Sequence, residues 1–311
     1  LAGSYRIPKG SKIVGGIQGP QQGLIWTDIA LWSMQFVGYP DVYGFNEIGT
    51  GCGLIAQKAA ASHNNVVYWM GQSQFYTLTA NGVQPLPCPV WDVVFQNINR
   101  NYTNKIRIAV NSYFGEIAWY YPSANSTGEN DSYVKYNTLL QQWDFGSLSR
   151  TAWINQSVLG PPIGAGSDKY LYQHETSNDA NGSPMPSFFQ TGYFTLMEGD
   201  MKTFVDQVWP DMKWGFYNGT TGGSTPIQPG GAVYDTPNAT IQLYFYTTDY
   251  AGQTPNIYGP FTLTQATQFI TPRFRGRLIS IVVSNPTDST GLGTFWRIGN
   301  MRYRHQPDGK Y

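Results

Sequence analysis

Short runs of alternating hydrophobic and polar residues, each ended by Gly, Pro, Asn or Asp, recur along the first two thirds of the chain. In VVYWMGQSQFYTLTANGVQPLP, from Val66 to Pro87, two aromatic runs flank Gly71. The dipeptide Asn81-Gly82, which is typical of tight hairpins, follows them. Alternation with a period of two predicts strands, and the turn residues between the runs predict hairpins. The stretch therefore predicts consecutive antiparallel strands of one small sheet.

A layout of strand, turn and aromatic strand recurs in segments 66–87, 105–123 with a turn at Gly115, 131–148 with a turn at Asn137, and 168–194, while 23–38 alternates as one run. The spacing between units is loosely 40 to 50 residues. Propeller blades repeat at this spacing, and a ring of blades leaves only short, protected sheet edges. We therefore expect about four blade-like units within residues 1–212, as an incomplete β-propeller. The opening LAGSYRIPKGSKIVGG resembles the interior of a domain, so we expect a fragment or a processed product.

The pattern changes after Pro210. Residues 213–232 form a Gly/Thr/Pro-rich connector, and longer alternating strands follow, such as ATIQLYFYTT and the nearly continuous apolar run GRLISIVVSN. These strands predict an antiparallel β-sandwich-like region over residues 233–311. One short helix is expected at VWDVVF, after PLPCP. The predicted fold class is all-β, with propeller-like blades followed by the sandwich-like region.

The amino-acid composition agrees with this fold and disfavours some classes of protein. The chain of 311 residues holds 35 Gly, 20 Pro, 22 Tyr and 10 Trp, which favours pleated sheets and many turns. Nineteen basic residues balance nineteen acidic ones, and 12% of positions are charged, so a globally basic nucleic-acid binder is disfavoured. Cys52 and Cys88 are too few for a disulfide scaffold and are interpreted as two buried thiols.

Two kinds of chemistry were weighed against structural roles. A glycoside hydrolase needs two carboxyl groups on either side of the scissile bond, and the candidates beside aromatic strands are Asp28, Asp92, Glu116, Asp144 and Glu175. Acidic residues near turns more often accept hydrogen bonds from backbone amides. A metal site could use His174, Glu175, Asp179 and Asn181, but HETSNDANG is also the composition of a solvated hairpin tip. We expect no catalytic residues, no metal and no cofactor.

The most distinctive charge pattern lies near the end of the chain. Between residues 272 and 311 there are seven Lys or Arg and two Asp. On a strand, residues two apart project from one face, so two short stripes are expected, made of Arg273, Arg275, Arg277, Arg302 and Arg304. Such stripes could contact acidic surfaces of a neighbouring subunit or DNA phosphates, with subunit contacts favoured. The alternative is a solvated strand face with ion pairs inside the chain.

A series of collinear segments resembles the tail hub or nozzle proteins of short-tailed bacteriophages, the packaged-DNA stabilisation family. In order they include IWTDIALW (25–32), GCGLIA (51–56), VYWMGQSQFY (67–76), VQPLPCPVWDVVF (83–95), AVNSYFGEIAWYYPS (109–123), YVKYNTLLQQWDFG (133–146), RTAW (150–153), YQHE (172–175), VDQVWPD (205–211), YGPFTLT (258–264), RFRGRL (273–278) and WRIGNMR (296–302). The chain departs from the family pattern at its start, where earlier blades are expected, and at its end in DGKY.

The resemblance implies a non-enzymatic virion protein with a β-propeller. It would assemble in the host cytoplasm as a ring, expected to be a hexamer, around the DNA channel of the tail, next to portal, adaptor and other tail proteins. There it would retain the packaged genome and conduct it during ejection, contacting double-stranded DNA without reading sequence and without inserting into a membrane. The alternative from a different class is a carbohydrate-binding or glycoside-hydrolysing β-propeller, a receptor-binding module.

Overall fold

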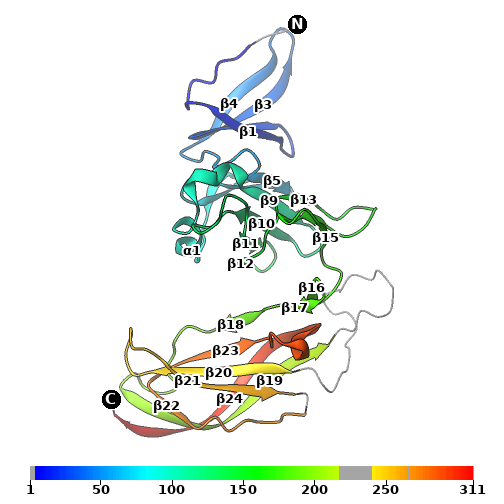
Figure 1. Ribbon diagram of the computed structural model, residues 1–311. Coiled ribbons are helices and arrows are strands. Elements are labelled where there is room, and N and C mark those ends of the chain that lie inside the picture. Colours follow the sequence, from blue (N-terminus) through cyan, green and yellow to red (C-terminus); the bar gives the residue numbers. More distant parts are fainter. Residues whose placement is uncertain (1–3, 217–239, 265, 311) are drawn as a thin grey trace. The chain divides into compact units, whose positions relative to one another are not determined.

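The computed structural model describes residues 4–216, 240–264 and 266–310, and the fold is almost entirely antiparallel β-sheet (Figure 1). The chain divides into two compact units, unit 1 (Leu1–His174) and unit 2 (Glu175–Tyr311). The predicted all-β class is therefore confirmed. Each unit has its own hydrophobic core and is described by itself.

Unit 1 consists of four successive antiparallel sheets in which each strand pairs with the next one in sequence. The strands of the first sheet are β1 (Ile13–Gln18), β2 (Gly23–Thr27), β3 (Ala30–Gly38) and β4 (Val42–Thr50). Those of the second sheet are β5 (Ala60–His63), β6 (Val66–Met70), β7 (Phe75–Thr79) and β8 (Gly82–Leu86). Those of the third sheet are β9 (Arg107–Asn111), β10 (Glu116–Tyr121), β11 (Ser132–Asn137) and β12 (Gln142–Ser147). The fourth sheet has three short strands, β13 (Ala152–Ile154), β14 (Ile163–Ala165) and β15 (Leu171–Gln173).

The four sheets begin at Ile13, Ala60, Arg107 and Ala152, so successive starts lie 47, 47 and 45 residues apart. This spacing lies within the range expected of blades. The first strands β1, β5, β9 and β13 contact one another in turn. The segment from Val66 to Pro87 supplies three strands of one of these sheets. The β-propeller itself is not confirmed and stays a prediction.

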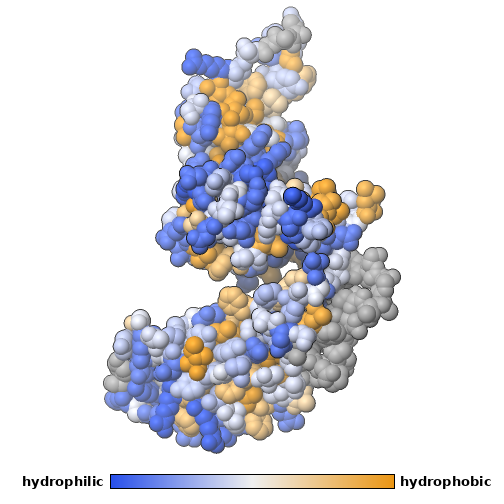
Figure 2. All heavy atoms as spheres, in the orientation of Figure 1, coloured by the Kyte–Doolittle hydropathy of each residue, from blue (hydrophilic) through white to orange (hydrophobic). Residues whose placement is uncertain are grey.

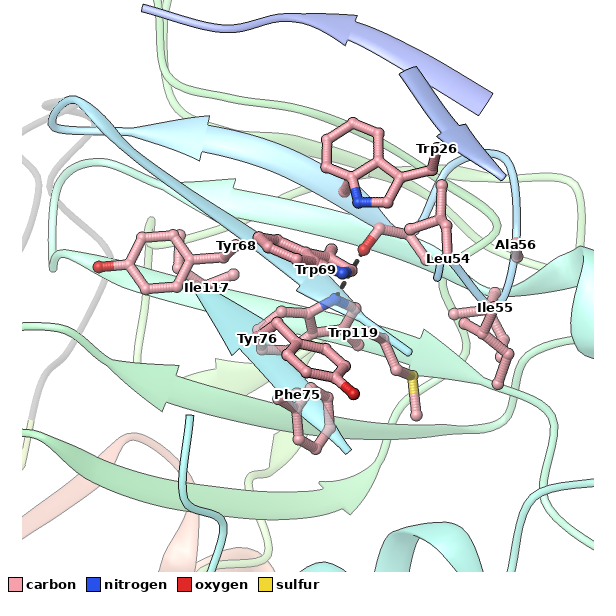
Figure 3. Packing of buried hydrophobic residues seen from close by; sticks show 14 of the residues in the cluster. Trp26, Leu54, Ile55, Ala56, Tyr68, Trp69, Phe75, Tyr76, Ile117 and Trp119 are labelled. Carbon is pink, nitrogen blue, oxygen red and sulfur yellow. Dashed lines mark hydrogen bonds between the residues drawn. The ribbon is translucent and has the colours of Figure 1, made fainter. Parts of the chain in front are cut away.

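Aromatic side chains fill the spaces between successive sheets (Figure 3). Trp26 of the first sheet meets Trp69 of the second, with ring centroids 5.5 Å apart. Phe75 of the second sheet meets Trp119 of the third at 4.7 Å. All four residues are fully buried, and each such pair contributes about 0.5–1.5 kcal/mol beyond the area it buries. Because side chains alternate along each strand, the second and third sheets each have two apolar faces.

The segment from Gly23 to Gly38, predicted as one alternating run, is a hairpin of β2 and β3. Thr27 closes the turn, since its hydroxyl accepts hydrogen bonds from the amides of Ile29 and Ala30 at 3.3 and 2.9 Å. Residues 51–53 begin the tight connection that follows β4. A Cβ on Gly53 would lie 2.0 Å from the carbonyl oxygen of Asp28, so only glycine fits there.

Two short helical segments separate the second and third sheets. They are α1 (Trp91–Phe95) and the 3₁₀ helix η1 (Arg100–Lys105). The short helix predicted at VWDVVF corresponds to α1, and its buried residues Val94 and Phe95 pack on the unit 1 core.

Unit 2 contains two sheets that enclose a separate apolar core. The first has the order β18 (Phe188–Gln190), β23 (Leu278–Ser284), β20 (Ile241–Thr248) and β21 (Asn256–Leu263). The second, called the long sheet here, has the order β22 (Phe274–Gly276), β19 (Met201–Phe216) and β24 (Thr294–Lys310). The remaining elements are the hairpin strands β16 (Asp179–Ala180) and β17 (Ser183–Pro184) and the 3₁₀ helix η2 (Ser289–Gly291).

The domain boundary predicted at residue 212 was placed too late. The units separate at His174 and Glu175, and β19 pairs along nearly all of β24, so residues 175–212 belong to the sandwich-like unit. The aromatic segment 168–194 contributes β15 to unit 1 and β18 to unit 2, so it is not one blade. The predicted connector 213–232 begins within β19, and its remainder lies outside the described residues.

Candidate functional site

The predicted arginine stripes lie on and beside the outer face of the long sheet. Strand alternation turns Phe274, Met301 and Tyr303 towards the core of unit 2. Arg275, Arg302 and Arg304 therefore project to the opposite side, and all three are exposed. The register sets Arg275 beside Phe204, Arg304 beside Gln207 and Arg302 beside Trp209, so strands β22 and β24 bring the two stripes to either side of β19.

Acidic side chains of the same sheet neutralise these arginines. Arg304 binds both carboxylate oxygens of Asp206, with Nε at 2.7 Å and a terminal nitrogen at 2.6 Å. Arg302 lies 3.2 Å from Asp211. The hydrogen bond from Arg304 is the main reason that the pKa of Asp206 falls below its ordinary value. Two of the acids stand on β19, about 90 to 100 residues before the arginines they pair with.

The other arginines also have intrachain neighbours. Arg275 lies 3.1 Å from Asp308 and stands over the ring of Phe204, 5.5 Å from its centroid. Arg277 donates to the backbone carbonyls of Gly199 and Asp249. Arg273 has a left-handed backbone with φ of 48° and lies close enough to Asp206 to lower the pKa of that carboxyl further. Arg275, Arg302 and Arg304 with their three carboxylates form a charge-paired face, which agrees with the alternative of a solvated strand face with ion pairs inside the chain.

Two of the candidate glycosidase carboxylates meet at a lysine on the third sheet. Lys135 Nζ lies 3.1 Å from Glu116 and 3.4 Å from Asp144, each on a neighbouring strand. Burial alone would lower the pKa of Lys135, but Glu116 and then Asp144 raise it above its ordinary value. Burial and then the charge of Asp144 raise the pKa of Tyr133 to about 12. Both carboxylates are therefore occupied by one cation.

The remaining candidate acids are not brought together with a second carboxylate by any contact of the described residues. Asp28 accepts hydrogen bonds from the amide and hydroxyl of Ser11 at 2.8 and 2.6 Å, and these bonds lower its pKa. Asp92 stands in the first turn of α1. Glu175 has a left-handed backbone, with φ of 60°. Sequence reasoning identified Glu116 and Asp144 as acids beside aromatic strands but missed the lysine between them.

His174, a predicted metal candidate, is engaged by a guanidinium. Arg150 Nε donates to His174 Nε2 at 2.7 Å, and the Trp153 ring lies tilted by 59° against the imidazole, with ring centroids 4.6 Å apart. Burial, and then the charge of Arg150, lowers the pKa of His174 to about 4. A Cβ on Gly164 would lie 2.9 Å from that nitrogen, so the glycine makes room for the contact. His174 is thus held neutral as an acceptor.

The rest of the proposed metal group forms a hairpin tip. Asp179 accepts a hydrogen bond from the amide of Gly182 at 2.8 Å, and Asn181 has a left-handed backbone. Within residues 4–216, 240–264 and 266–310, no group of three His, Cys, Asp or Glu side chains could hold a metal ion.

The two thiols are free but unequal. Cys52 is buried and Cys88 is half-buried, so the prediction of two buried thiols holds for the first only. Burial raises the pKa of both, that of Cys88 to about 11, which disfavours a reactive thiolate. Among the helices of the described residues, none is long and apolar enough to cross a membrane.

Comparisons with known proteins leave the family open. No protein-family model and no curated protein matches the sequence. Similar solved structures include the extracellular domain of the putative hybrid two-component system BT3049 from B. thetaiotaomicron, at 10% identity and a TM-score of 0.37. That match covers 98% of this chain but 39% of the other, so the chain spans well under half the length of that relative.

Two further matches are weaker. One is to a chain from the assembly of an S. cerevisiae dbp5 variant with nup159, a gle1 variant, IP6 and ADP, at 10% identity and a TM-score of 0.29, covering 88% of this chain and 75% of that one. The other is to the exo-β-1,3-galactanase of Phanerochaete chrysosporium, at 8% identity and a TM-score of 0.16, covering 95% and 94%. All three TM-scores are too low to carry an argument.

Proposed function

We propose that this chain is a structural component of a bacteriophage tail, a hub or nozzle subunit that forms a ring around the DNA channel. In this role it retains the packaged genome and conducts it during ejection, with no enzymatic step. Its partners are further copies of itself, expected to number six, the portal or adaptor, and other tail proteins. The tail assignment rests on the collinear segments that resemble the packaged-DNA stabilisation family.

The observation that carries an assembly role is the distribution of exposed apolar side chains on unit 1. Apolar side chains reach its surface in several places (Figure 2). Exposed fractions are 73% for Phe36, 88% for Tyr39, 95% for Leu159 and 75% for Leu171. Large exposed apolar groups favour burial against a partner. The carboxylates that could serve hydrolysis, Glu116 and Asp144, are paired with Lys135, which favours assembly over catalysis.

The charge-paired face of the long sheet supports the DNA part of the proposal. Each phosphate contact made by a free cation adds salt-dependent affinity, so a channel lined by free arginines would hold DNA back. In unit 2, Arg302 and Arg304 already pair with carboxylates. DNA passing such a face would meet few free cations. This favours passage with little grip.

Locating the chain in particles tests the proposed function. A tagged chain expressed during infection is expected in the tails of purified particles, and particles that lack it are expected to lose packaged DNA. The control is a tag on a capsid protein. Hydrolysis or specific binding of a glycan that disappears in Glu116→Gln, together with tails that lack the protein, would favour the carbohydrate-active alternative.

A further inference from the structure

The last residue of unit 1 is held by side chains from the beginning of the same sheet. Unit 1 ends at His174, which directly follows β15. Its imidazole accepts the hydrogen bond from Arg150 and contacts Trp153, and these residues lie just before and on β13. The backbone amide of His174 donates to the carbonyl of Pro162 at 2.8 Å. Side-chain and backbone contacts therefore both hold the end of unit 1 on the fourth sheet.

The contact between Arg150 and His174 exists in only one protonation state of the histidine. An arginine is always protonated, so its Nε is a donor. The Nε2 of a histidine accepts a hydrogen bond only when the imidazole is neutral, because both ring nitrogens carry protons in the imidazolium. A proton on His174 would set two donors, on two cations, against each other across 2.7 Å.

The charged groups around the contact do not compensate a second cation. Arg150 is 9% exposed and stands over the ring of Tyr172, 4.4 Å from its centroid. The Tyr172 hydroxyl donates to Asp168, and Tyr120, Tyr172 and Asp168 partly oppose the effect of burial on Arg150. The carboxylate of Glu175 follows the imidazole in the chain. Burial and then Arg150 nevertheless lower the pKa of the imidazole, so these acids do not balance the repulsion.

The strand β15 is the weaker side of the contact. Among the described residues it is an edge strand of the fourth sheet, and it pairs with β14 over three residues. The other side is anchored more firmly. Arg150 donates to the carbonyl of Ser149 at 2.6 Å, and its own carbonyl accepts from the buried Asn130 at 3.0 Å. Trp153 donates to Val110 of the third sheet. If two cations repel here, β15 is therefore expected to separate first.

We propose that the contact between Arg150 and His174 is a pH-controlled latch on the end of unit 1. With His174 neutral, the latch holds β15 and the point at which the chain leaves the unit. With His174 protonated, β15 detaches from β14, while the first three sheets of unit 1 stay folded. The detached residues lengthen the connection between the units.

The latch goes beyond the proposed function and does not depend on it. A longer flexible connection lets its two ends reach a wider range of separations. The inference therefore names a condition, mild acid, under which the connection constrains the two units less.

The direction of the response follows from the two states of the histidine. The pKa of His174 is about 4 in the closed form and returns to about 6.5 when the ring is free in water. The open form therefore binds the proton first as the pH falls. The closed form is fully favoured above pH 6.5, and it loses this advantage progressively until it is itself protonated near pH 4.

Hydrogen exchange on the full chain at pH 7 and pH 5 tests the latch. Exchange is followed by mass spectrometry and expressed as protection factors, which removes the pH dependence of the chemical exchange rate. Residues 161–175 are expected to lose protection by about ten-fold or more at pH 5. The strands β10 and β11 of the third sheet, and β20 and β23 of unit 2, are expected to keep theirs.

Two variants assign the response to one histidine. In His174→Gln the side-chain carbonyl can accept from Arg150 and does not titrate, so the protection of residues 161–175 should be the same at both pH values. His63→Gln is the matched control, because His63 is a mostly buried histidine (7% exposed) of the second sheet whose pKa is also lowered by burial. Its acid response at residues 161–175 should match the wild type.

Three results would overturn the latch. The first is equal protection of residues 161–175 in the wild type at pH 7 and pH 5. The second is an equal loss of protection in the third sheet, since acid would then loosen unit 1 as a whole. The third is an acid response that persists in His174→Gln. The wild-type profile is a complete test by itself, so the inference remains falsifiable if that variant does not fold.

Discussion

Unit 1 and unit 2 are both antiparallel β-structures, but they pair their strands over different distances in sequence. In unit 1 every strand of a sheet pairs with its neighbour along the chain. In unit 2 the long sheet pairs β19 with β24, so Asp206 meets Arg304 across 98 residues. A short-range meander can be read from turns and alternation, whereas a long-range ladder depends on the whole fold. The difference explains why the boundary between the units was misplaced.

The exposed sheet faces of the two units also differ in their chemistry. The exposed face of the fourth sheet is apolar, so it gains free energy when a partner covers it. The outer face of the long sheet carries ion pairs such as Arg304–Asp206 and Arg302–Asp211, which water already solvates. Exposed ion pairs contribute little to stability or to association. The comparison therefore favours unit 1 over the long sheet as the place where a partner would bury apolar surface.

The largest expected effect follows from truncating the core of one unit. Trp119 is fully buried against Phe75 and donates to Ala59. Trp119→Ala leaves a cavity and an unpaired carbonyl and is expected to cost about 3–5 kcal/mol. Hydrogen exchange should show lost protection in unit 1 while the strands of unit 2 remain protected.

The reciprocal variant is Phe245→Ala, which truncates the core of unit 2 and should leave unit 1 protected. Joint loss of protection in both units, in either variant, would mean that they fold as one and that the comparison between them fails.

The turns of unit 1 are specified by residues close together in sequence, so this part of the fold could be predicted. Asn137 ends β11 by accepting hydrogen bonds from the amides of Leu139 and Leu140, and Gly115 supplies the positive φ between β9 and β10. Both turns were predicted. The connection at Thr27 was not, because Asp28 and Ile29 continue the alternation of polar and apolar residues through the turn.

The candidate sites were predicted less well, since they depend on pairing between distant residues. The arginines were predicted to lie on strands, but two of their acids, Asp206 and Asp211, stand on β19, a strand that the sequence grouped mainly with the other unit. Arg150 and His174 are 24 residues apart and meet only because β14 offers Gly164 between them. No pattern in the sequence links these three positions.

Lowering the pH is expected to destabilise unit 1, by less than the core substitutions do. The pKa of His174 is about 4 in the folded chain and about 6.5 when unfolded, so the unfolded state binds the proton first. The free energy of unfolding of unit 1 should fall as the pH decreases through 6.5, and this loss should level off below 4. The full shift corresponds to about 3 kcal/mol, and solvent near the half-buried ring reduces it.

Urea unfolding of unit 1 between pH 7 and pH 4 measures this loss. His174 contacts Arg150 and Trp153, and Arg150 in turn stands over the ring of Tyr172, whose hydroxyl donates to Asp168. His174→Gln is the control, expected to flatten this part of the pH profile. An unchanged profile in that variant would assign the acid sensitivity to other groups.

The smallest effect on stability, with a clear effect on DNA binding, is expected at the arginine face. Asp206→Asn releases Arg304 and reduces the carboxylate charge near Arg273. The melting temperature should change little because the pair is exposed. Filter binding to double-stranded DNA should become tighter, with log K falling more steeply against log salt by about 0.9 for each added phosphate contact.

Asp41→Asn, at an exposed carboxylate of unit 1, changes the net charge equally and is the matched control. Because it frees no arginine of the long sheet, its salt dependence should match the wild type. If both variants bind DNA alike, overall charge governs the interaction and the pairing on the long sheet does not. A larger gain for Asp206→Asn would show that Asp206 keeps Arg304 from binding phosphates, which is the property that a conduit for DNA requires.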